Sequence, residues 1–230
     1  MSPISDDLHP DPSGGANTTN GNESLLEVEV KFLLEGLDGF RQRLLSAGAE
    51  LISPRVYERN VRFDTPDGAL LQRQELLRLR QDTRSRLTFK GPSAEDAASE
   101  AKVREEIELE IGDFERLSTI FQRLGFMPVQ VYEKYRETYL WRNVEIVLDE
   151  MPFGDFIELE GKENALKDVA SALGLDWSKR VLANYLGLME LCRLSFELPF
   201  SDLTFGNFEG HPVDLGRLLP VCVLLDLEGE

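Results

Sequence analysis

The sequence contains few cysteines, fewer basic than acidic residues and no long apolar run. Two cysteines among 230 residues are too few for a disulfide framework or a zinc cage. The 42 acidic and 25 basic residues give a net charge of −17, which disfavours a nucleic-acid binder that neutralises phosphates. No segment approaches the ~18 continuous apolar residues of a membrane span, and the opening residues lack the pattern of a signal peptide. We therefore expect a cytoplasmic protein with no nucleic-acid partner and no membrane.

The composition changes at two points along the chain. Residues 1–22 are rich in Pro, Gly, Asn and Ser and predict a disordered tail. Residues 23–193 carry periodic apolar patterns and form the expected domain, and an apolar share of 42% is sufficient for a core. Residues 194–230 are acidic, and we expect a solvated extension there, with a partner-binding tail or a lid over an anion site as alternatives.

One succession of patterns occurs twice in the expected domain. The first copy has an alternating strand over Leu26–Phe32 and then a helix that ends at Gly48. The second copy has a strand over Glu106–Ile111 and a helix that begins at Asp113 and ends at Gly125. Similar tetrapeptides follow the two helices, Val56–Arg59 in the first copy and Val131–Lys134 in the second. Two strand-like runs then complete each copy: Leu76–Arg80 and Arg86–Lys90 in the first, and Val144–Asp149 and Phe156–Glu160 in the second.

This repetition predicts an internal duplication of a unit of one strand, one helix and three further strands. Two such units supply eight mostly antiparallel strands, which is the number that closes a small barrel. The sequence therefore predicts an α+β fold built on an internally duplicated, eight-stranded antiparallel β-barrel.

The charged residues of these strands fall on one face if each strand alternates regularly. That face collects eight bases and eight acids, so the rest of the chain carries the whole negative excess. The residues of the face are Glu27, Glu29, Lys31, Arg78, Arg80, Arg86, Lys90, Arg104, Glu106, Glu108, Glu110, Lys134, Arg136, Asp149, Glu158 and Glu160. Charges along a single strand usually mark a solvated face, where ion pairs contribute only about 0–1 kcal/mol each. Glutamate is depleted in strands, however, so three Glu-x-Glu pairs on one face indicate a bound cation.

The chemistry of this face fits a polyphosphate with a metal ion. Glu-x-Glu places two carboxylates about 7 Å apart on one strand face, and hard ions such as Mg²⁺ and Mn²⁺ favour such oxygen ligands. Arginine and lysine match phosphate oxygens, arginine through its bidentate fork. The late strands of the first copy are basic and those of the second are acidic. We therefore expect one wall that binds phosphates and an opposite wall that binds metal.

Several motifs in this chain resemble those of the CYTH family, the triphosphate tunnel metalloenzymes. They follow one another between residues 25 and 191: Glu27-Val-Glu-Val-Lys31, Phe63-Asp-Thr-Pro-Asp67, Leu77-Arg-Leu-Arg80, Thr88-Phe-Lys-Gly91, Arg104-Glu-Glu-Ile-Glu108, Lys134-Tyr-Arg136, Leu148-Asp-Glu150 and Phe156-Ile-Glu-Leu-Glu-Gly161. The resemblance implies an eight-stranded antiparallel barrel that forms a tunnel, with helices packed outside. It also implies an enzyme that acts on triphosphates with Mg²⁺ or Mn²⁺.

The resemblance further implies a role for individual residues. The implied metal ligands are Glu27, Glu29, Asp149, Glu158 and Glu160. The implied triphosphate contacts are Lys31, Arg78, Arg80, Lys90, Arg104, Lys134 and Arg136. Lys31 is also the candidate catalytic residue, which handles a proton near the attacking water or the leaving group, and Glu106 and Glu108 either bind metal or hold the basic residues in place. The C-terminal helix of the family often carries a Ser-Tyr pair where this chain has Asn184-Tyr185, so we assign no contact to that helix.

Two reactions use the same wall residues, because phosphoryl transfer depends on positioning and charge neutralisation. Hydrolysis of the terminal phosphate of inorganic triphosphate, or of an organic triphosphate such as thiamine triphosphate, is the expected activity. The alternative is a class IV adenylate cyclase that converts ATP to cyclic AMP and pyrophosphate. A cyclase must hold adenine, and the aromatic candidates Tyr57, Phe63, Phe153 and Phe156 are more often packing residues in such a barrel. A non-catalytic polyphosphate-binding module is the second alternative, and a homodimer remains open.

Overall fold

The computed structural model describes residues 26–93 and 99–218, so the predicted N-terminal tail lies outside the described residues. Eight antiparallel strands form a closed barrel in the order β1-β5-β4-β3-β2-β6-β7-β8. The strands are β1 (Leu26–Leu34), β2 (Glu50–Asp64), β3 (Leu76–Gln81), β4 (Ser85–Pro92), β5 (Lys102–Ile111), β6 (Met127–Trp141), β7 (Val144–Met151) and β8 (Gly154–Glu160). The predicted eight-stranded antiparallel barrel is confirmed.

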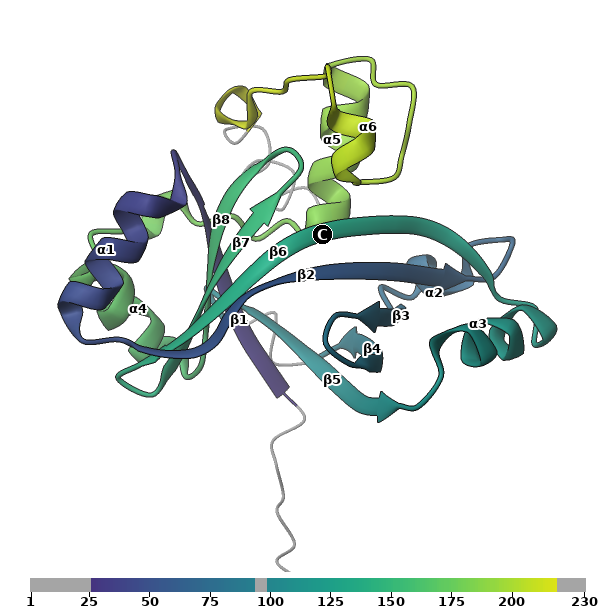
Figure 1. The fold of residues 1–230 in the computed structure, drawn as a ribbon, viewed down its shortest axis with the longest axis horizontal. Coiled ribbons are helices and arrows are strands. Elements are labelled where there is room, and N and C mark those ends of the chain that lie inside the picture. Colours follow the sequence, from purple (N-terminus) through teal and green to yellow (C-terminus); the bar gives the residue numbers. More distant parts are fainter. Residues whose placement is uncertain (1–25, 94–98, 219–230) are drawn as a thin grey trace, which may run out of the picture.

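Helices lie outside the barrel on three sides (Figure 1). They are α1 (Leu37–Ala47), α2 (Ala69–Gln72), α3 (Phe114–Arg123), α4 (Glu163–Ala172), α5 (Tyr185–Ser195) and α6 (Phe205–Phe208), with the 3₁₀ turns η2 (Trp177–Lys179) and η3 (Leu215–Arg217). In Figure 1, α1 and α4 lie at the left end, α2 and α3 at the right end, and α5 and α6 above β6. Two predicted helix boundaries are confirmed: Gly48 ends α1 with φ 82°, and the Asp113 carboxylate accepts a hydrogen bond from Arg116 N at the start of α3.

The strand order shows the duplication directly. If β1–β4 are exchanged with β5–β8, each neighbouring pair of strands becomes another neighbouring pair, and the ring maps onto itself. The two halves meet at four strand pairs, β1–β5, β4–β5, β2–β6 and β1–β8, and the exchange maps β1–β5 and β2–β6 onto themselves. The barrel therefore has the topology of two similar units.

The two similar tetrapeptides do not occupy equivalent positions in this symmetric ring. Glu58 of the first faces the barrel interior and forms ion pairs with Lys134 and Arg80. Glu133 of the second faces outward, where its carboxylate accepts a hydrogen bond from Phe205 N. Side chains alternate with a period of two, so a shift of one residue reverses the face. The strand order therefore supports the duplication, whereas the two tetrapeptides are shifted by one residue relative to each other.

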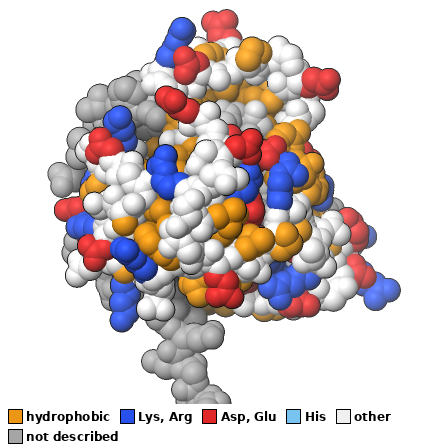
Figure 2. All heavy atoms as spheres, turned by 60° about the vertical axis from the view of Figure 1, so that its left-hand side comes forward, with side chains coloured by type: hydrophobic (Ala, Val, Ile, Leu, Met, Phe, Trp, Pro, Cys, Tyr) orange, Lys and Arg blue, Asp and Glu red, His pale blue; other side chains and the backbone are white. Residues whose placement is uncertain are grey.

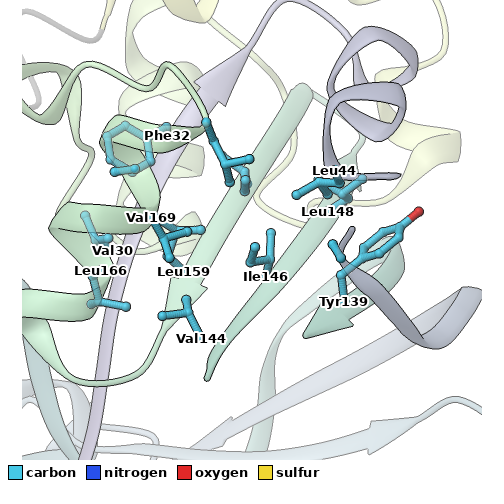
Figure 3. Close-up of a cluster of buried hydrophobic side chains, with 14 of the residues drawn as sticks. Val30, Phe32, Leu44, Tyr139, Val144, Ile146, Leu148, Leu159, Leu166 and Val169 are labelled. Atoms are coloured by element: carbon cyan, nitrogen blue, oxygen red, sulfur yellow. The ribbon is translucent and has the colours of Figure 1, made fainter. Parts of the chain in front are cut away.

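The largest apolar cluster lies between the outer face of the barrel and two helices (Figure 3). It joins β1, β6, β7 and β8 to α1 and α4 through Leu44, Ile146, Leu159, Leu166 and neighbouring side chains. Strand residues of the opposite parity point into the barrel, and most of those that line the cavity are charged. This inverts the usual arrangement of a small barrel, because the apolar core lies outside the ring and the polar groups lie within it.

Residues 196–218 differ from the solvated extension expected from their acidity. Leu198, Leu203, Phe208 and Leu215 are buried in a second apolar cluster with α5 and the β7–β8 hairpin. Strand β6 is longer than β7, so the part of β6 before Tyr135 does not pair with β7. Leu203 pairs with that part: Leu203 N donates to Val131 O and Glu133 N donates to Leu203 O, both at 2.9 Å. The extension therefore covers an open sheet edge as well as apolar surface.

No helix among the described residues is long and apolar enough to cross a membrane. The face shown in Figure 2 carries Lys and Arg side chains interspersed with Asp and Glu, and basic groups do not gather there into one patch.

Replacing a side chain of the outer core tests the packing. Leu159→Ala removes a fully buried side chain between β8 and the helices, so we expect a loss of about 2–5 kcal/mol in the free energy of unfolding. The control Leu194→Ala truncates a side chain that is 61% exposed and is expected to change it by less than about 0.5 kcal/mol. Urea unfolding of both variants measures the difference, and equal losses would contradict the described core.

Candidate active site

A cavity of about 290 Å³ occupies the interior of the barrel. Nine basic and six acidic side chains line it, in a chain whose net charge is −17. The basic ones are Lys31, Arg78, Arg80, Arg86, Lys90, Lys102, Arg104, Lys134 and Arg136, and the acidic ones are Glu29, Glu106, Glu108, Glu145, Glu158 and Glu160. Two further buried carboxylates, Glu58 and Asp149, lie beside Lys134. The cavity therefore brings together all of the predicted phosphate contacts in surroundings suited to an anion.

The clustered carboxylates and the arginine pair of β3 lie on opposite sides of the ring, whereas other acidic and basic side chains of the lining are interspersed. The carboxylates of Glu29, Glu158 and Glu160 come from the neighbouring strands β1 and β8. Arg78 and Arg80 come from β3, which is four strands from β8 in either direction around the ring. The structure thus agrees with the expectation of two facing walls.

Glu29, Glu158 and Glu160 form the one carboxylate cluster with metal-site spacing in the described part of the chain. One oxygen of each lies within 4.8 Å of the others. Hard divalent ions take such carboxylate oxygens, and Mg²⁺ completes its shell with water and substrate phosphate. The donor set therefore fits Mg²⁺ or Mn²⁺. Glu27 lies opposite Arg104 in the β1–β5 pair, but its side chain is outside the described part of the structure.

Lys31 lies on β1 beside the carboxylate cluster and is 2% exposed. Its Nζ is 3.6 Å from Glu29 Oε1 and 3.5 Å from Glu158 Oε1. Burial alone would lower the pKa of Lys31, but the two carboxylates raise it above its usual value. The side chain is therefore an ammonium group at neutral pH, able to donate hydrogen bonds or a proton to an anion.

The basic wall is incompletely neutralised. Burial and the neighbouring Arg78 lower the pKa of Arg80, although Glu58 opposes them. Burial would raise the pKa of Tyr132, but Arg78 and Arg80 lower it below its usual value. The buried Nε atoms of three arginines on adjacent strands have no hydrogen-bond partner among the described residues: Arg62, Arg78 and Arg86. Unpaired guanidinium donors beside a cavity are groups that an oxyanion can satisfy.

Asp149 is fully buried and connects three elements. Its carboxylate accepts hydrogen bonds from Lys134 Nζ at 2.9 Å, Arg136 Nε at 2.7 Å and Tyr185 Oη at 3.0 Å. It is not one of the clustered carboxylates, so its role as a metal ligand stays a prediction. What the structure shows is that Asp149 fixes the positions of two predicted phosphate contacts.

Glu106 and Glu108, for which two roles were open, contact basic residues. Glu106 Oε2 is 3.3 Å from Lys90 Nζ. Glu108 accepts hydrogen bonds from Arg86 Nη1 at 3.3 Å and from Thr88 Oγ1 at 2.9 Å. This arrangement favours the second of the two roles, in which they hold the basic residues in place. Glu110, placed on the same face by alternation, lies outside the cavity beside Arg84.

The sequence analysis missed several polar residues of the barrel interior. Glu58 and Asn60 precede the Phe63 motif on β2, and alternation from Glu58 would have placed both on the inner face. Tyr132 accepts a hydrogen bond from Arg78 Nη1 at 2.9 Å. Tyr185 enters from α5, because Asn184 caps that helix through hydrogen bonds from Leu186 N and Gly187 N and so starts it beside the cavity. The available signal was the Asn184-Tyr185 pair at the position of the family's Ser-Tyr pair, to which no contact was assigned because Asn replaces Ser.

Three of the four aromatic candidates for an adenine pocket are packing residues. Phe63 is buried against Phe121 of α3, and Phe153 and Phe156 are buried against Tyr185. Tyr57 lies on the outer face, 40% exposed, and its ring is tilted against that of Tyr135. The interpretation as packing residues is therefore confirmed for Phe63, Phe153 and Phe156.

A family model for the CYTH domain matches residues 25–175, more than half of the chain. A closed barrel with facing carboxylate and guanidinium walls agrees with that match, and this chain belongs to the CYTH family. The matched region ends before α5 and the extension.

Relatives of this chain include proteins named for adenylate cyclase activity. A Methanocaldococcus jannaschii protein named "Putative adenylate cyclase MJ0240" is 30% identical over 179 residues, which cover 73% of this chain and 100% of that protein. Adenylate cyclase CyaB of Aeromonas hydrophila is 25% identical over 178 residues, 71% of this chain and 88% of that protein. Among solved structures, the PH1819 protein of Pyrococcus horikoshii has a TM-score of 0.60 and 28% identity, with 71% of this chain and 98% of that chain covered.

The pH dependence of stability tests the buried charges. Burial would raise the pKa of Glu58, but Lys134 and Arg80 lower it from 4.5 to about 2. Its ion pairs therefore stabilise the fold above the unfolded-state pKa, and this stabilisation is lost as the pH falls toward 2. We expect the free energy of unfolding to fall more between pH 6 and pH 3 in the parent protein than in Glu58→Gln, measured by urea unfolding. Equal falls would contradict the described pairing of Glu58.

Proposed function

We propose that this protein hydrolyses the terminal phosphate of a triphosphate with the help of Mg²⁺ or Mn²⁺. The observation that carries the proposal is the cavity itself, where a three-carboxylate cluster faces incompletely neutralised arginines inside a closed barrel. A linear triphosphate has oxygens along its whole length, so it can contact both walls at once, the basic one directly and the acidic one through metal.

Each set of residues has a distinct part in this proposal. Glu29, Glu158 and Glu160, with Glu27 and Asp149 as predicted from the resemblance, would hold the metal, which would polarise the phosphates and help to orient water. The basic residues Arg78, Arg80, Lys90, Arg104, Lys134 and Arg136 would bind phosphate oxygens and neutralise charge that develops in the transition state. Lys31, an ammonium group next to the carboxylates, would donate a proton or a hydrogen bond to the leaving phosphate.

Cyclisation of ATP is the second candidate, supported by the names of the two relatives. Against it, the two aromatic residues that line the cavity, Tyr132 and Tyr185, both have hydrogen-bonded hydroxyl groups in the ion network. The cavity of about 290 Å³ is lined by fifteen charged groups, and its aliphatic side chains are Leu76 and Leu186, whereas pockets for a base are lined mainly by apolar and aromatic groups. These features favour inorganic triphosphate over ATP as the substrate. The three clustered carboxylates argue against a module that binds polyphosphate without catalysis.

Product analysis tests the reaction. The purified protein is incubated with Mg²⁺ or Mn²⁺ and, separately, with inorganic triphosphate, thiamine triphosphate and ATP. We expect free phosphate from inorganic triphosphate and no cyclic AMP from ATP, because the cavity binds a phosphate chain without holding a base. Cyclic AMP with pyrophosphate from ATP would establish the cyclase instead, and no turnover of any of the three would reject both activities.

The carboxylate cluster predicts a specific defect in metal use. Glu29→Gln removes a charge from the cluster and should raise the Mg²⁺ concentration for half-maximal activity by about tenfold or more, since charged oxygens are the preferred ligands. The control Glu110→Gln makes the same change on a neighbouring strand outside the cavity, where the side chain is 63% exposed, and should leave that concentration unaltered. Titration of activity with Mg²⁺ measures both, and an unaltered value in Glu29→Gln would remove Glu29 from the metal site.

A further inference from the structure

The second apolar cluster connects the C-terminal extension to the barrel interior through aromatic rings. Phe208 of α6 packs on Phe153 with ring centroids 6.1 Å apart. Phe153 in turn contacts the ring of Tyr185 at 6.4 Å, and Phe156 contacts it at 5.2 Å. Phe208 is therefore one aromatic residue away from a side chain that lines the cavity.

Tyr185 is the point at which this packing reaches the charged groups. Its hydroxyl donates to Asp149 at 3.0 Å, and its ring centroid is 5.3 Å from Lys31 Nζ and 5.7 Å from Lys134 Nζ. A shift of this side chain would remove a hydrogen bond that orients Asp149.

Helix α5 carries Tyr185 and is held at both ends. Before the helix, Val181 N donates to Lys31 O at 2.8 Å, which ties the incoming segment to β1. After the helix, the extension returns across α5 and pairs with β6 at Leu203, and Val131 N donates to Asp202 Oδ1 at 2.8 Å. The ring of Phe205 packs at a tilt against that of Tyr135, with centroids 5.3 Å apart. Without the second attachment, α5 would be fixed to the barrel only by the hydrogen bond at Val181, by Tyr185 and by its own apolar face.

We propose that residues 196–218 are a positioning element of the tunnel. Through Phe208 and Phe153 they hold Tyr185 against Asp149, and thereby fix the cationic groups of Lys134 and Arg136 toward the cavity. The ring of Phe208 contacts Phe153 and Phe200 and is not part of the cavity lining, so it acts through its neighbours and is a positioning residue. The effect on turnover rests on the proposed function, whereas the effect on α5 does not.

Cys192 reports directly on α5, because it lies on this helix and is fully buried. In a Cys222→Ser background, the rate at which a thiol reagent modifies Cys192 measures how often the helix leaves its site. Phe208→Ala is the test variant. Phe121→Ala is the matched control: both phenylalanines are 8% exposed, but Phe121 packs against Phe63 in a separate cluster that does not touch α5.

In Phe208→Ala we expect Cys192 to react at least about tenfold faster than in the parent, with a rate that depends only weakly on urea below the unfolding transition. Opening of α5 alone exposes little surface, whereas global unfolding exposes much more. In Phe121→Ala, the rate should follow global unfolding and rise steeply with urea. If Phe208→Ala shows the same steep dependence as the control, the extension does not hold α5 locally and the proposal is wrong.

Turnover of inorganic triphosphate tests the second half of the proposal. Phe208→Ala and Tyr185→Phe should each lower kcat by about tenfold, and Phe121→Ala should leave kcat unchanged at temperatures where it is folded. The double variant Phe208→Ala/Tyr185→Phe should be no slower than the slower single variant, since both act through the same hydroxyl. Multiplying effects, or full activity in Tyr185→Phe, would overturn the link to Asp149. A parent protein that fails to turn over triphosphate would reject the proposed function, while the Cys192 rates would still decide the role of the extension.

Discussion

The hydrogen bonds and ion pairs at Asp149 depend on three parts of the chain being in place together. Lys134 and Arg136 come from β6, Tyr185 comes from α5, and Asp149 itself comes from β7. A charge buried this deeply is costly in free energy unless its partners surround it, and removal of one partner of a buried pair typically costs about 3–5 kcal/mol. Closure of the barrel, the position of α5 and the arrangement of the cations therefore stabilise one another. The apolar packing outside the ring supplies the free energy that keeps so polar an interior folded.

A protein with a net negative charge can still bind an anion in a basic cavity, because charges act over short distances in salt solution. At physiological ionic strength exposed charges are screened beyond about 8 Å, so most of the surface acids act weakly on a group inside the barrel. Within the cavity, the charged side chains are buried close to one another, and charges act strongly where the effective dielectric constant is low. The local excess of basic over acidic side chains therefore decides what binds, and the net charge of −17 does not.

The sequence predicted much of the site because strands have a simple period. Alternation put Glu29, Lys31, Arg78 and Arg80 on one face, and closure of the ring turned that face inward. The match between the two tetrapeptides was wrong about equivalent positions, because Glu58 faces the inside of the barrel and Glu133, at the same place in the second tetrapeptide, faces outward. Bulges and register are set by pairing between strands, which a single strand does not encode.

By itself, the sequence determined the number of strands, the side of each strand that carries charge and the residue types suited to a triphosphate with a metal ion. The tertiary structure alone decided which of these charges neutralise one another, and it brought Tyr185 and the C-terminal extension to the cavity. The physical reason is range: alternation and capping act between residues a few positions apart, whereas the contacts of Tyr185 with Asp149, and of Leu203 with β6, join segments 36 and about 70 residues apart. Only burial of apolar surface by the whole chain brings such segments together.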